Sequence, residues 1–267
     1  MGSPVRALIS TRSTLRLLIE RDLRSKYSED RLGYFWTVLE PLLMAIVYWF
    51  VFSVIMSRSV GATPYIVFLL VGQLFWQWGS GSIRTSSKAL KGESRLVRST
   101  NLPRELWVLR VVGTEAVQFV MALPVLLLFM AVFWGDISLD PAKLLLFPVA
   151  MLLLVVLTTG IGFLMASVTV LYPDVSKLVR IVLQVGFYLS PVLYGVHDVD
   201  ARLSEKWQWI YGLNPFVGII DMARAGIFPQ QFTGWIAPGL SVVVSFALLV
   251  VGTRVFRRLE NAVLKEI

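Results

Sequence analysis

Two carboxylic acids lie in or beside long apolar runs of this sequence, and they are the residues best placed to do chemistry. Glu40 falls inside the apolar run 36–56, and Glu115 directly precedes the run 116–135. A buried charge is costly unless it is paired, so such acids are candidates for function. General acid and base catalysis would need partners on one face, but these acids belong to different predicted helices. The sequence therefore predicts that they either pair with Arg110 or Arg31 or line a polar path.

The sequence lacks the residues that other catalytic sites or metal sites would need. The chain has no cysteine and a single histidine, His197, which excludes thiolate metal sites and histidine-rich clusters. It also has no GxxxxGK[ST] phosphate loop and no dinucleotide-type glycine fingerprint. We therefore predict no catalytic residue, no metal and no cofactor in this chain, and any ATP must be bound by a partner.

The composition is that of a membrane protein. Of the 267 residues, 56% are hydrophobic and 16% are charged, and the mean hydropathy is +0.71. Soluble domains carry about a quarter charged residues. The net charge of +8 could indicate a nucleic acid partner, but basic residues beside apolar spans more often follow the positive-inside rule. We therefore predict contact with membrane lipids and no binding of nucleic acid.

The apolar runs predict an all-α integral membrane protein with six transmembrane helices. A span needs about 20 apolar residues. Five clear candidates are 36–56, 59–83, 116–135, 144–173 and 225–253, and a shorter run, 181–196, supplies the sixth.

The distribution of positive charge sets the predicted orientation. Six spans with both termini cytoplasmic put 20 of the 25 Lys and Arg residues on the cytoplasmic side. A seven-span alternative would put the C-terminal basic cluster on the wrong side. The region 190–228, rich in proline and glycine, is then predicted to form outer re-entrant helices, because irregular backbone at membrane depth must line a cavity or be buried in protein.

An amphipathic helix precedes the first span. In the segment 11–31, Leu15, Ile19, Leu23 and Tyr27 recur every fourth residue, and basic residues lie largely on the other side. This pattern predicts a helix in the cytoplasmic interface of the membrane. The alternative is a helix packed on a soluble domain, but residues 1–267 contain no such domain and are predicted to form one transmembrane domain.

The longest predicted cytoplasmic loop, 84–105, contains six basic residues and two acids. A loop of this kind is usually a solvated connection. Within it, residues 94–99 predict a short helix between Gly92 and the Asn101-Leu102-Pro103 segment, because proline interrupts helical geometry. A short surface helix is suited to docking on a partner protein.

Aromatic side chains are plentiful, at 12% of the residues. Most are expected to be anchors at the level of the lipid headgroups. A subset could instead face a polar conduit, where flat rings stack on sugar faces. This subset, with the acid among it, comprises Tyr34, Phe35, Trp36, Glu40, Tyr48, Trp49, Phe52 and Tyr188.

Four segments resemble a known family over nearly the whole chain. They are RDLRSKYSEDRLGYFWTVLEPLL, NLPRE, YPDVSKLVRIVLQVGFYLSPVLYG and NPFVGIIDMARAGIF, in this order. Together they resemble the membrane subunits of type-2 ATP-binding-cassette (ABC) exporters, in the branch that exports polysaccharides and polyol phosphates. The resemblance implies a multi-pass homodimer in the bacterial cytoplasmic membrane, joined to two copies of a separate ATPase that binds ATP and Mg²⁺. The implied cargo is a polyprenyl-pyrophosphate-linked polymer such as O-antigen, capsule, teichoic acid or galactan.

The resemblance also implies roles for individual positions. The end of the amphipathic helix would meet the lipid phosphates, and its candidates are Arg21, Arg24, Lys26 and Arg31. The loop helix would receive the motion of the ATPase, and its candidates are Glu93, Arg95, Leu96, Arg98 and Arg104.

Three other functions remain open at this point. An exporter of the same fold for a small hydrophobic molecule or drug would have a more hydrophobic path with fewer aromatic side chains facing it. A membrane-embedded enzyme acting on lipid-linked sugars would need clustered His, Asp or Glu residues. An ion-coupled transporter would show inverted repeats and ionisable residues at the midplane.

Overall fold

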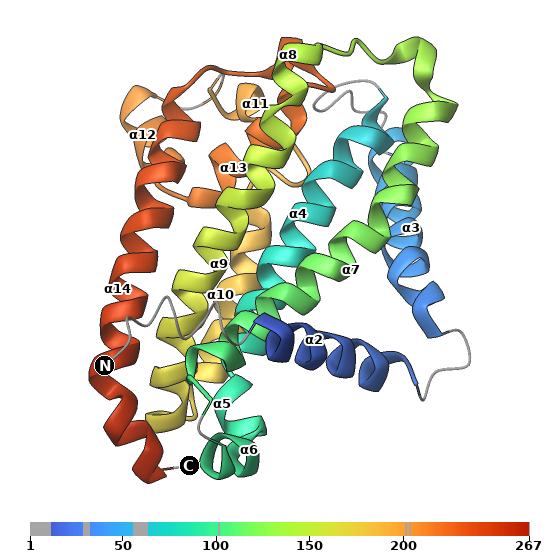
Figure 1. Cartoon of the computed structure of the whole chain (residues 1–267). Helices are drawn as coiled ribbons and strands as arrows, with labels where there is room; N and C mark the ends of the chain where they lie inside the picture. The colour runs from blue at the N-terminus through green and yellow to red at the C-terminus, as the bar shows by residue number, and fades with distance from the viewer. Residues whose placement is uncertain are drawn as a thin grey trace.

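The computed structural model describes residues 12–28, 33–55, 64–100, 102–200, 202 and 204–266, with the side chains of 52–54 and 205 excepted. Within these residues the fold is built from helices alone, as predicted. Figure 1 shows the long helices side by side, with short helices at both ends. The elements are α2 (Arg12–Tyr27), η1 (Gly33–Phe35), α3 (Trp36–Trp49), the π-helical η2 (Phe50–Ile55), α4 (Tyr65–Ser86), α5 (Ala89–Gly92), α6 (Ser94–Ser99), α7 (Glu105–Val132), η3 (Trp134–Asp136), α8 (Pro141–Leu144), α9 (Leu146–Leu171), α10 (Val175–Leu189), α11 (Val196–Asp200), α12 (Glu205–Gly212), α13 (Pro215–Ala225), η4 (Pro229–Gln231) and α14 (Ile236–Glu266).

Four helices of the described chain are long and apolar enough to cross a membrane. They are α4, α7, the continuous pair α8 and α9, and α14. α3 continues into the π-helical segment η2, and α10 has 15 residues. The prediction of a helical membrane protein is confirmed, and the count of six spans stays a prediction.

Three helix boundaries differ from the predicted apolar runs, because charge was taken as the end of a span. α7 begins at Glu105 rather than near residue 116. α14 begins at Ile236 rather than 225, since the 3-10 helix η4 and Gly234, at φ +109°, separate it from α13. It also extends to Glu266, beyond the predicted end at 253, because Phe256 and Val263 are buried among other helices.

α4 is the centre of the bundle. Of its most apolar window of 18 residues, 89% are buried inside the protein. It lies against α3, α7, α9, α10 and α13. Most of the large hydrophobic core surrounds it, and a smaller core of Leu90, Val97, Trp107, Phe163 and Phe256 joins α5 and α6 to the long helices.

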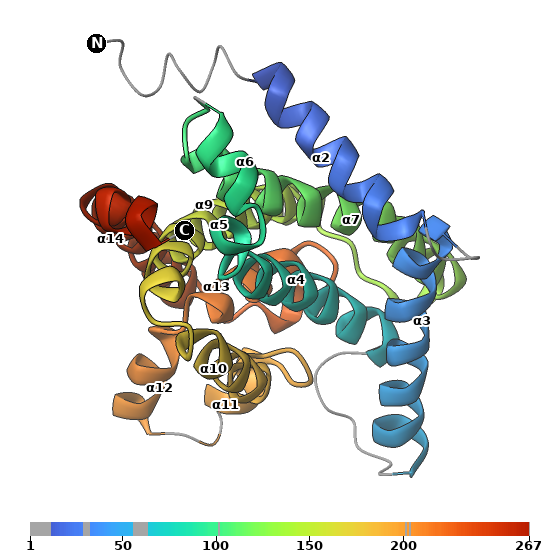
Figure 2. The ribbon, with the colours of Figure 1, turned by 90° about the horizontal axis from the view of Figure 1, so that it is seen from below.

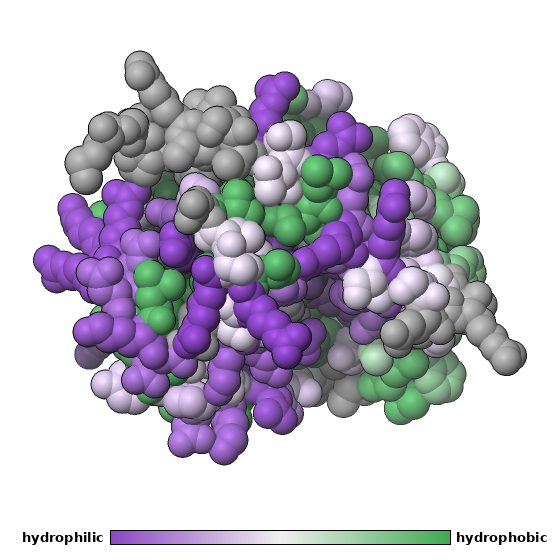
Figure 3. Space-filling view, turned by 60° about the horizontal axis from the view of Figure 1, so that its bottom comes forward, coloured by the Kyte–Doolittle hydropathy of each residue, from purple (hydrophilic) through white to green (hydrophobic). Residues whose placement is uncertain are grey.

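The basic segments gather at one end of the bundle. Figure 1 shows α2, α5, α6 and the last turns of α14 at its lower end, and Figure 2 views this end directly. We call it the basic end. Figure 3 shows it as a mostly hydrophilic face with hydrophobic residues toward its margins. The loop helix predicted at 94–99 is confirmed as α6, with the same bounds.

The opposite end is held together by a buried arginine in α13. Only 3% of Arg224 is exposed. Its guanidinium donates to the carbonyl oxygen of Phe68 in α4 at 3.0 Å and to that of Val192, after α10, at 2.8 Å, with further bonds to the carbonyls of Pro191 and Tyr194. The predicted broken helices of region 190–228 are α11, α12 and α13, and Arg224 fixes them to the bundle. Their re-entrant placement in a membrane stays a prediction.

Two glycines allow α9 and α14 to approach closely. A Cβ added at Gly160 would lie 2.5 Å from the backbone nitrogen of Leu249. One added at Gly252 would press into the carbonyl oxygen of Gly160. Small residues of this kind are typical of helix interfaces in membranes. The crossing of α9 and α14 therefore depends on both positions.

We expect Gly252→Ala to destabilise the protein by about 1–3 kcal/mol, because the added methyl group forces two backbones apart. The measurement is the melting temperature of the purified protein in detergent. The matched control is Gly239→Ala in the same helix, where a Cβ would meet nothing within 4 Å. Since alanine favours helix over glycine, the control should melt at or above the wild-type temperature, and equal melting of both variants would contradict the close crossing.

Candidate functional site

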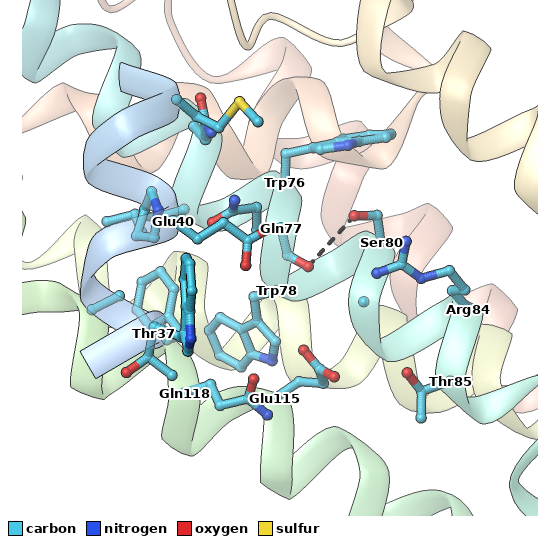
Figure 4. A pocket seen from close by; sticks show the side chains of 18 of the residues that line it. Thr37, Glu40, Trp76, Gln77, Trp78, Ser80, Arg84, Thr85, Glu115 and Gln118 are labelled. Atoms are coloured by element: carbon cyan, nitrogen blue, oxygen red, sulfur yellow. Dashed lines mark hydrogen bonds between the residues drawn. The ribbon is translucent and has the colours of Figure 1, made fainter. Parts of the chain in front are cut away.

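A polar cavity of about 670 Å³ lies among α2, α3, α4 and α7, with one residue from α10. Figure 4 shows side chains from several of these helices around one space. The lining residues that carry polar, charged or large aromatic side chains are Lys26, Tyr27, Trp36, Thr37, Glu40, Tyr48, Gln73, Trp76, Gln77, Trp78, Ser80, Arg84, Thr85, Glu115, Gln118, Phe119 and Phe187.

α4 contributes a polar stripe to this cavity. Gln73, Gln77, Ser80 and Arg84 follow one another at intervals of four, three and four residues, which places them on one face of a helix. All of them line the cavity. The most buried helix of the fold thus has a hydrophilic side.

Glu40 and Glu115 face the same cavity from α3 and α7 (Figure 4). Lys26 and Arg84 act electrostatically on Glu115, so two cations accompany the two acids. The carboxylate of Glu115 lies against α4, because a Cβ at Gly81 would be 2.6 Å from Oε2 of Glu115. The cavity is therefore close to charge balance.

The pairing of these acids with Arg110 was predicted as one alternative, and it is wrong. NH1 of Arg110 lies 3.1 Å from Oδ1 of Asp22 and 3.0 Å from Oε1 of Glu93. Those two nearer acids neutralise the guanidinium. The other predicted partner, Arg31, lies outside the described residues, and the polar-path alternative is the one that the cavity fits.

Two buried polar atoms of the cavity wall have no hydrogen-bond partner within the described part of the chain. They are Oε1 of Gln73 and Nε1 of Trp78, whose residues are 4% and 3% exposed. Both atoms have almost no accessible surface, so they lie behind the cavity wall. The side chains that a ligand can contact are the partly exposed ones, among them Gln77 and Gln118.

A second cavity of about 290 Å³ continues from the first toward α10. The two share Tyr48, Trp76, Ser80, Arg84 and Phe187, and the second adds Arg180 and Tyr188 among others. The ring centroids of Tyr48 and Phe187 are 6.2 Å apart, and those of Trp76 and Phe187 are 6.0 Å apart. An aromatic cluster therefore marks the junction between α3, α4 and α10.

Only some of the residues that were predicted to line a path do line a cavity in the structure. Trp36, Glu40 and Tyr48 line the first cavity, and Tyr48 and Tyr188 line the second. The remaining four do not line either cavity as far as the structure describes them. Tyr34 packs on the ring of Tyr27, with centroids 4.8 Å apart, and Phe35 and Trp49 are exposed on the surface. The side chain of Phe52 lies outside the described residues.

The basic residues predicted to lie near a lipid phosphate also differ in their surroundings. Lys26 lines the cavity, and its Nζ donates to Oε1 of Gln118 at 2.6 Å. Arg21 instead pairs with Glu93 at 2.7 Å. Arg24 is exposed on α2, and Arg31 lies outside the described residues.

The charge of Arg21 is stabilised by its neighbours. Partial burial opposes the charged form, but hydrogen bonds and electrostatic attraction from Asp22 and Glu93 outweigh it, so the pKa of Arg21 is raised. This guanidinium stays charged and engaged at the basic end.

The predicted coupling residues lie on two sides of the loop. Arg95, Leu96 and Arg98 are exposed on α6, whereas Glu93 points inward to Arg21 and Arg110. Nε of Arg104 is 3.8 Å from Oε1 of Glu260 in α14. Three of the five are thus free to meet a partner, and two hold the loop to the protein.

The cavity presents groups that can bind a polar ligand. Among the residues that the structure describes, no three His, Cys, Asp or Glu side chains group as metal ligands. The cavity offers indole faces, amides and balanced charges. Trp76, Gln77 and Gln118 were missed by the sequence analysis, and the four-three-four spacing of polar residues in α4 is the signal that could have found the stripe.

Membrane-length helices around a polar cavity, with a basic end that presents a short exposed helix, are the arrangement of a membrane transport subunit. The family model of the ABC-2 type transporters matches residues 13–228, and the chain belongs to this family. The predicted family and the predicted location in the membrane are confirmed.

Several curated relatives are similar to this chain over most of its length. The O-antigen export system permease protein of Klebsiella pneumoniae is 26% identical over 246 residues, which cover 92% of each chain. That of Myxococcus xanthus is 28% identical over 227 residues and 85% of each chain. The polysialic acid transport protein of Escherichia coli is 26% identical over 259 residues, covering 94% of this chain and 95% of its own length.

The cavity predicts a difference in reactivity between two nearby serines of α4. The chain has no cysteine, so single cysteines can be introduced without background. Ser80 lines the cavity and Ser82 is fully buried. We expect the thiol of Ser80→Cys to react with a water-soluble maleimide roughly tenfold faster than that of Ser82→Cys, because accessible thiols react selectively. Mass spectrometry of the labelled protein measures both rates, and similar rates would show that the cavity is closed to water.

Proposed function

We propose that this chain is the membrane subunit of an ABC exporter that carries a lipid-linked polysaccharide across the bacterial cytoplasmic membrane. The observation that carries the proposal is the polar, indole-lined cavity in the middle of apolar helices. Relatives that export O-antigen and polysialic acid support this class of cargo. Amides and carboxylates bind sugar hydroxyls, while indole faces stack on sugar rings.

The proposed topology has six spans with both termini in the cytoplasm. α3 with its π-helical continuation and α10 supply the two spans that length alone does not identify. The basic end then faces the cytoplasm, in line with the positive-inside rule. The pieces α11, α12 and α13 form the re-entrant region at the outer side, where Arg224 satisfies backbone carbonyls that lipid could not.

The proposed conduit lies between two copies of the chain. Figure 2 shows α3 and α10 on either side of α4, and the two connected cavities lie along them. Both helices keep large side chains exposed, among them Trp49 at 38% and Tyr188 at 64%. A second copy facing α3 and α10 would cover these side chains and close the aromatic-lined path.

The lipid carrier is proposed to enter at the basic end. Lys26 lies at the cavity wall and Arg24 is exposed on the same helix, so both can meet phosphate oxygens. The polymer would then follow the cavities while the carrier tail stays in the lipid. Weak stacking contacts suit a sliding polymer because each is replaced by the next.

Energy for export is proposed to come from two copies of a separate ABC ATPase that bind ATP and Mg²⁺. The chain lacks a phosphate loop. α6 presents Arg95, Leu96 and Arg98 to such a partner while Val97 is buried beneath them. The chain itself is therefore a transport subunit rather than an enzyme.

A second candidate function is export of a small hydrophobic molecule. An apolar cavity of about 940 Å³ lies along α10 and α12, with residues of α4, α9 and α13 in its wall, and supports this alternative. It is a separate space from the polar stripe, although Trp76 and Leu183 border both regions. The two cargoes therefore depend on different side chains.

We expect Trp36→Ala and Tyr48→Ala each to lower polysaccharide export by roughly two- to tenfold, the value of one aromatic contact. Both side chains line the cavities. The measurement is uptake of lipid-linked polysaccharide into inverted vesicles that contain the permease and its ATPase. Trp235→Ala is the control, because Trp235 is 66% exposed and packs on Phe232 away from the cavities.

Normal export by both cavity variants would contradict the proposal that the polysaccharide passes through these cavities. The second candidate function replaces the first if Trp36→Ala and Tyr48→Ala are silent but Val182→Ala, at a residue that lines the apolar cavity and neither polar one, reduces efflux of a hydrophobic dye. Absence of any ATP-dependent export by the wild-type complex would reject both.

The outward side of α6 generates a further prediction. Reversing both charges, Arg95→Glu with Arg98→Glu, should weaken docking of the ATPase and lower the ATP-driven export rate by roughly an order of magnitude, as opposite charges across an interface do when one sign is inverted. Co-purification of the ATPase and export are measured together. Lys88→Glu, exposed on the same loop but outside α6, is the control, and wild-type docking by the double variant would remove α6 from the interface.

A further inference from the structure

Four charged side chains at the basic end form one ion network across three elements. Arg110 of α7 contacts Asp22 of α2 at 3.1 Å and Glu93, which precedes α6, at 3.0 Å. Arg21 of α2 contacts Glu93 at 2.7 Å and its neighbour Asp22 at 3.0 Å. Two cations and two acids thus balance, and every link between elements is within hydrogen-bond distance.

The network is centred on a buried charge. The side chain of Arg110 is only 7% exposed, compared with 22% for Asp22 and 25% for Glu93. Its guanidinium also lies over the ring of Trp107, at 5.2 Å from the centroid. Charge-assisted bonds in such surroundings are strong and directional. Arg110 therefore holds α2 and the loop in a fixed relation to α7.

The loop is attached to α7 by apolar contacts as well. Leu90 of α5 and Val97 of α6 belong to the same buried cluster as Trp107 of α7. A displacement of α6 is thus passed to the start of α7 through both packing and charge.

α2 is fixed to α7 at two further points. A Cβ at Gly113 would be 2.5 Å from Cδ1 of Ile19, so the two helices are in close contact there. Farther along α7, Gln118 accepts hydrogen bonds from Lys26 at 2.6 Å and from the hydroxyl of Tyr27 at 3.1 Å. α2, the loop and the first half of α7 are therefore joined as one body.

That body carries part of the cavity wall. Lys26 and Tyr27 of α2 and Glu115 and Gln118 of α7 all line the polar cavity. Figure 1 shows α2 crossing α7 between α5 and α6 at one end and α3 at the other. α7 also packs against α4, so a displacement of α6 reaches the contact where Glu115 lies against Gly81 of α4.

We propose that Asp22 and Arg110 are positioning residues that couple the ATPase-docking loop to the wall of the polar cavity. They touch neither the cargo nor the ATPase and act through Glu93 and α2. This inference rests on the proposed function, because it needs an ATPase that moves α6 and a cargo in the cavity. It adds a defined ionic route between the two sites.

The test is the amount of lipid-linked polysaccharide exported per ATP hydrolysed by the wild-type and variant complexes in vesicles. Asp22→Asn removes one arm of the network, while Arg110 keeps Glu93 as a partner and stays paired. We expect the ratio of export to hydrolysis to fall roughly tenfold, within the range of measured couplings along connected networks. Assembly with the ATPase and melting temperature should stay near wild type.

Two matched variants distinguish positioning from general damage. Asp22→Glu keeps the charge and should restore most of the export per ATP. Glu20→Gln, two residues away on α2, breaks an exposed pair with Arg16 and should have no effect. The proposal would be overturned if the Asp22→Asn complex exported as much polysaccharide per ATP as wild type. It would also be overturned if the Asp22→Glu complex showed the same loss as the Asp22→Asn complex.

A second measurement does not depend on the stability of Asp22→Asn. In the cysteine-free chain, Ile19→Cys with Gly113→Cys places two thiols at the close contact of α2 and α7. If the two helices move as one body, oxidation to a disulfide leaves export per ATP unchanged. Loss of export on oxidation that returns on reduction would show that α2 must slide on α7, and would overturn the proposal. The proposed function fails separately, if the wild-type complex exports no polysaccharide.

Discussion

The structure depends on one constraint: polar groups among apolar helices must be satisfied inside the protein, because lipid offers no hydrogen bonds. The two buried arginines show how this is done. Arg224 donates to backbone carbonyls of α4 and of the segment after α10, which fixes the broken helices at one end. Arg110 binds two acids at the basic end. Between these two ends lies the polar cavity, whose wall groups can hydrogen-bond only to one another or to what fills the space.

The same constraint explains why the site lies on α4. A helix that is almost wholly buried can keep glutamines and a serine at membrane depth only where neighbouring helices leave a space for polar molecules. Glu40 and Glu115 enter this space together with Lys26 and Arg84, so that neither sign of charge prevails. The wall thus has more hydrogen-bonding groups than net charge.

Much of the architecture could be predicted from the sequence, and the errors have physical causes. Hydropathy identified the long helices, and the flanking glycine and proline identified the helix at 94–99, because these signals act locally. Hydropathy failed at Glu105, where α7 begins before its apolar part. The charges of this first part are paired elsewhere in the chain: Arg110 with Asp22 and Glu93, and Glu105 with Arg257. The stripe of α4 was missed for another reason. The run 59–83 was chosen because it has no charged residue, and glutamine and serine carry no charge, although their spacing indicates a polar face.

The residues of the site differ in how far sequence could identify them. Trp36, Glu40 and Tyr48 were predicted because an acid and aromatic rings stand out in an apolar run, whereas Trp49 has the same chemistry and faces away from both cavities. Residue type selects candidates, and the rotation of α3 decides among them. The rotation is set where Ala45 and Pro41 are buried against the bundle, which turns Glu40 and Tyr48 toward α4. The residues that α3 contributes to the cavity thus depend on which face of α3 packs against the bundle. The packing of Pro41 and Ala45 therefore decides which of its large side chains can line the cavity.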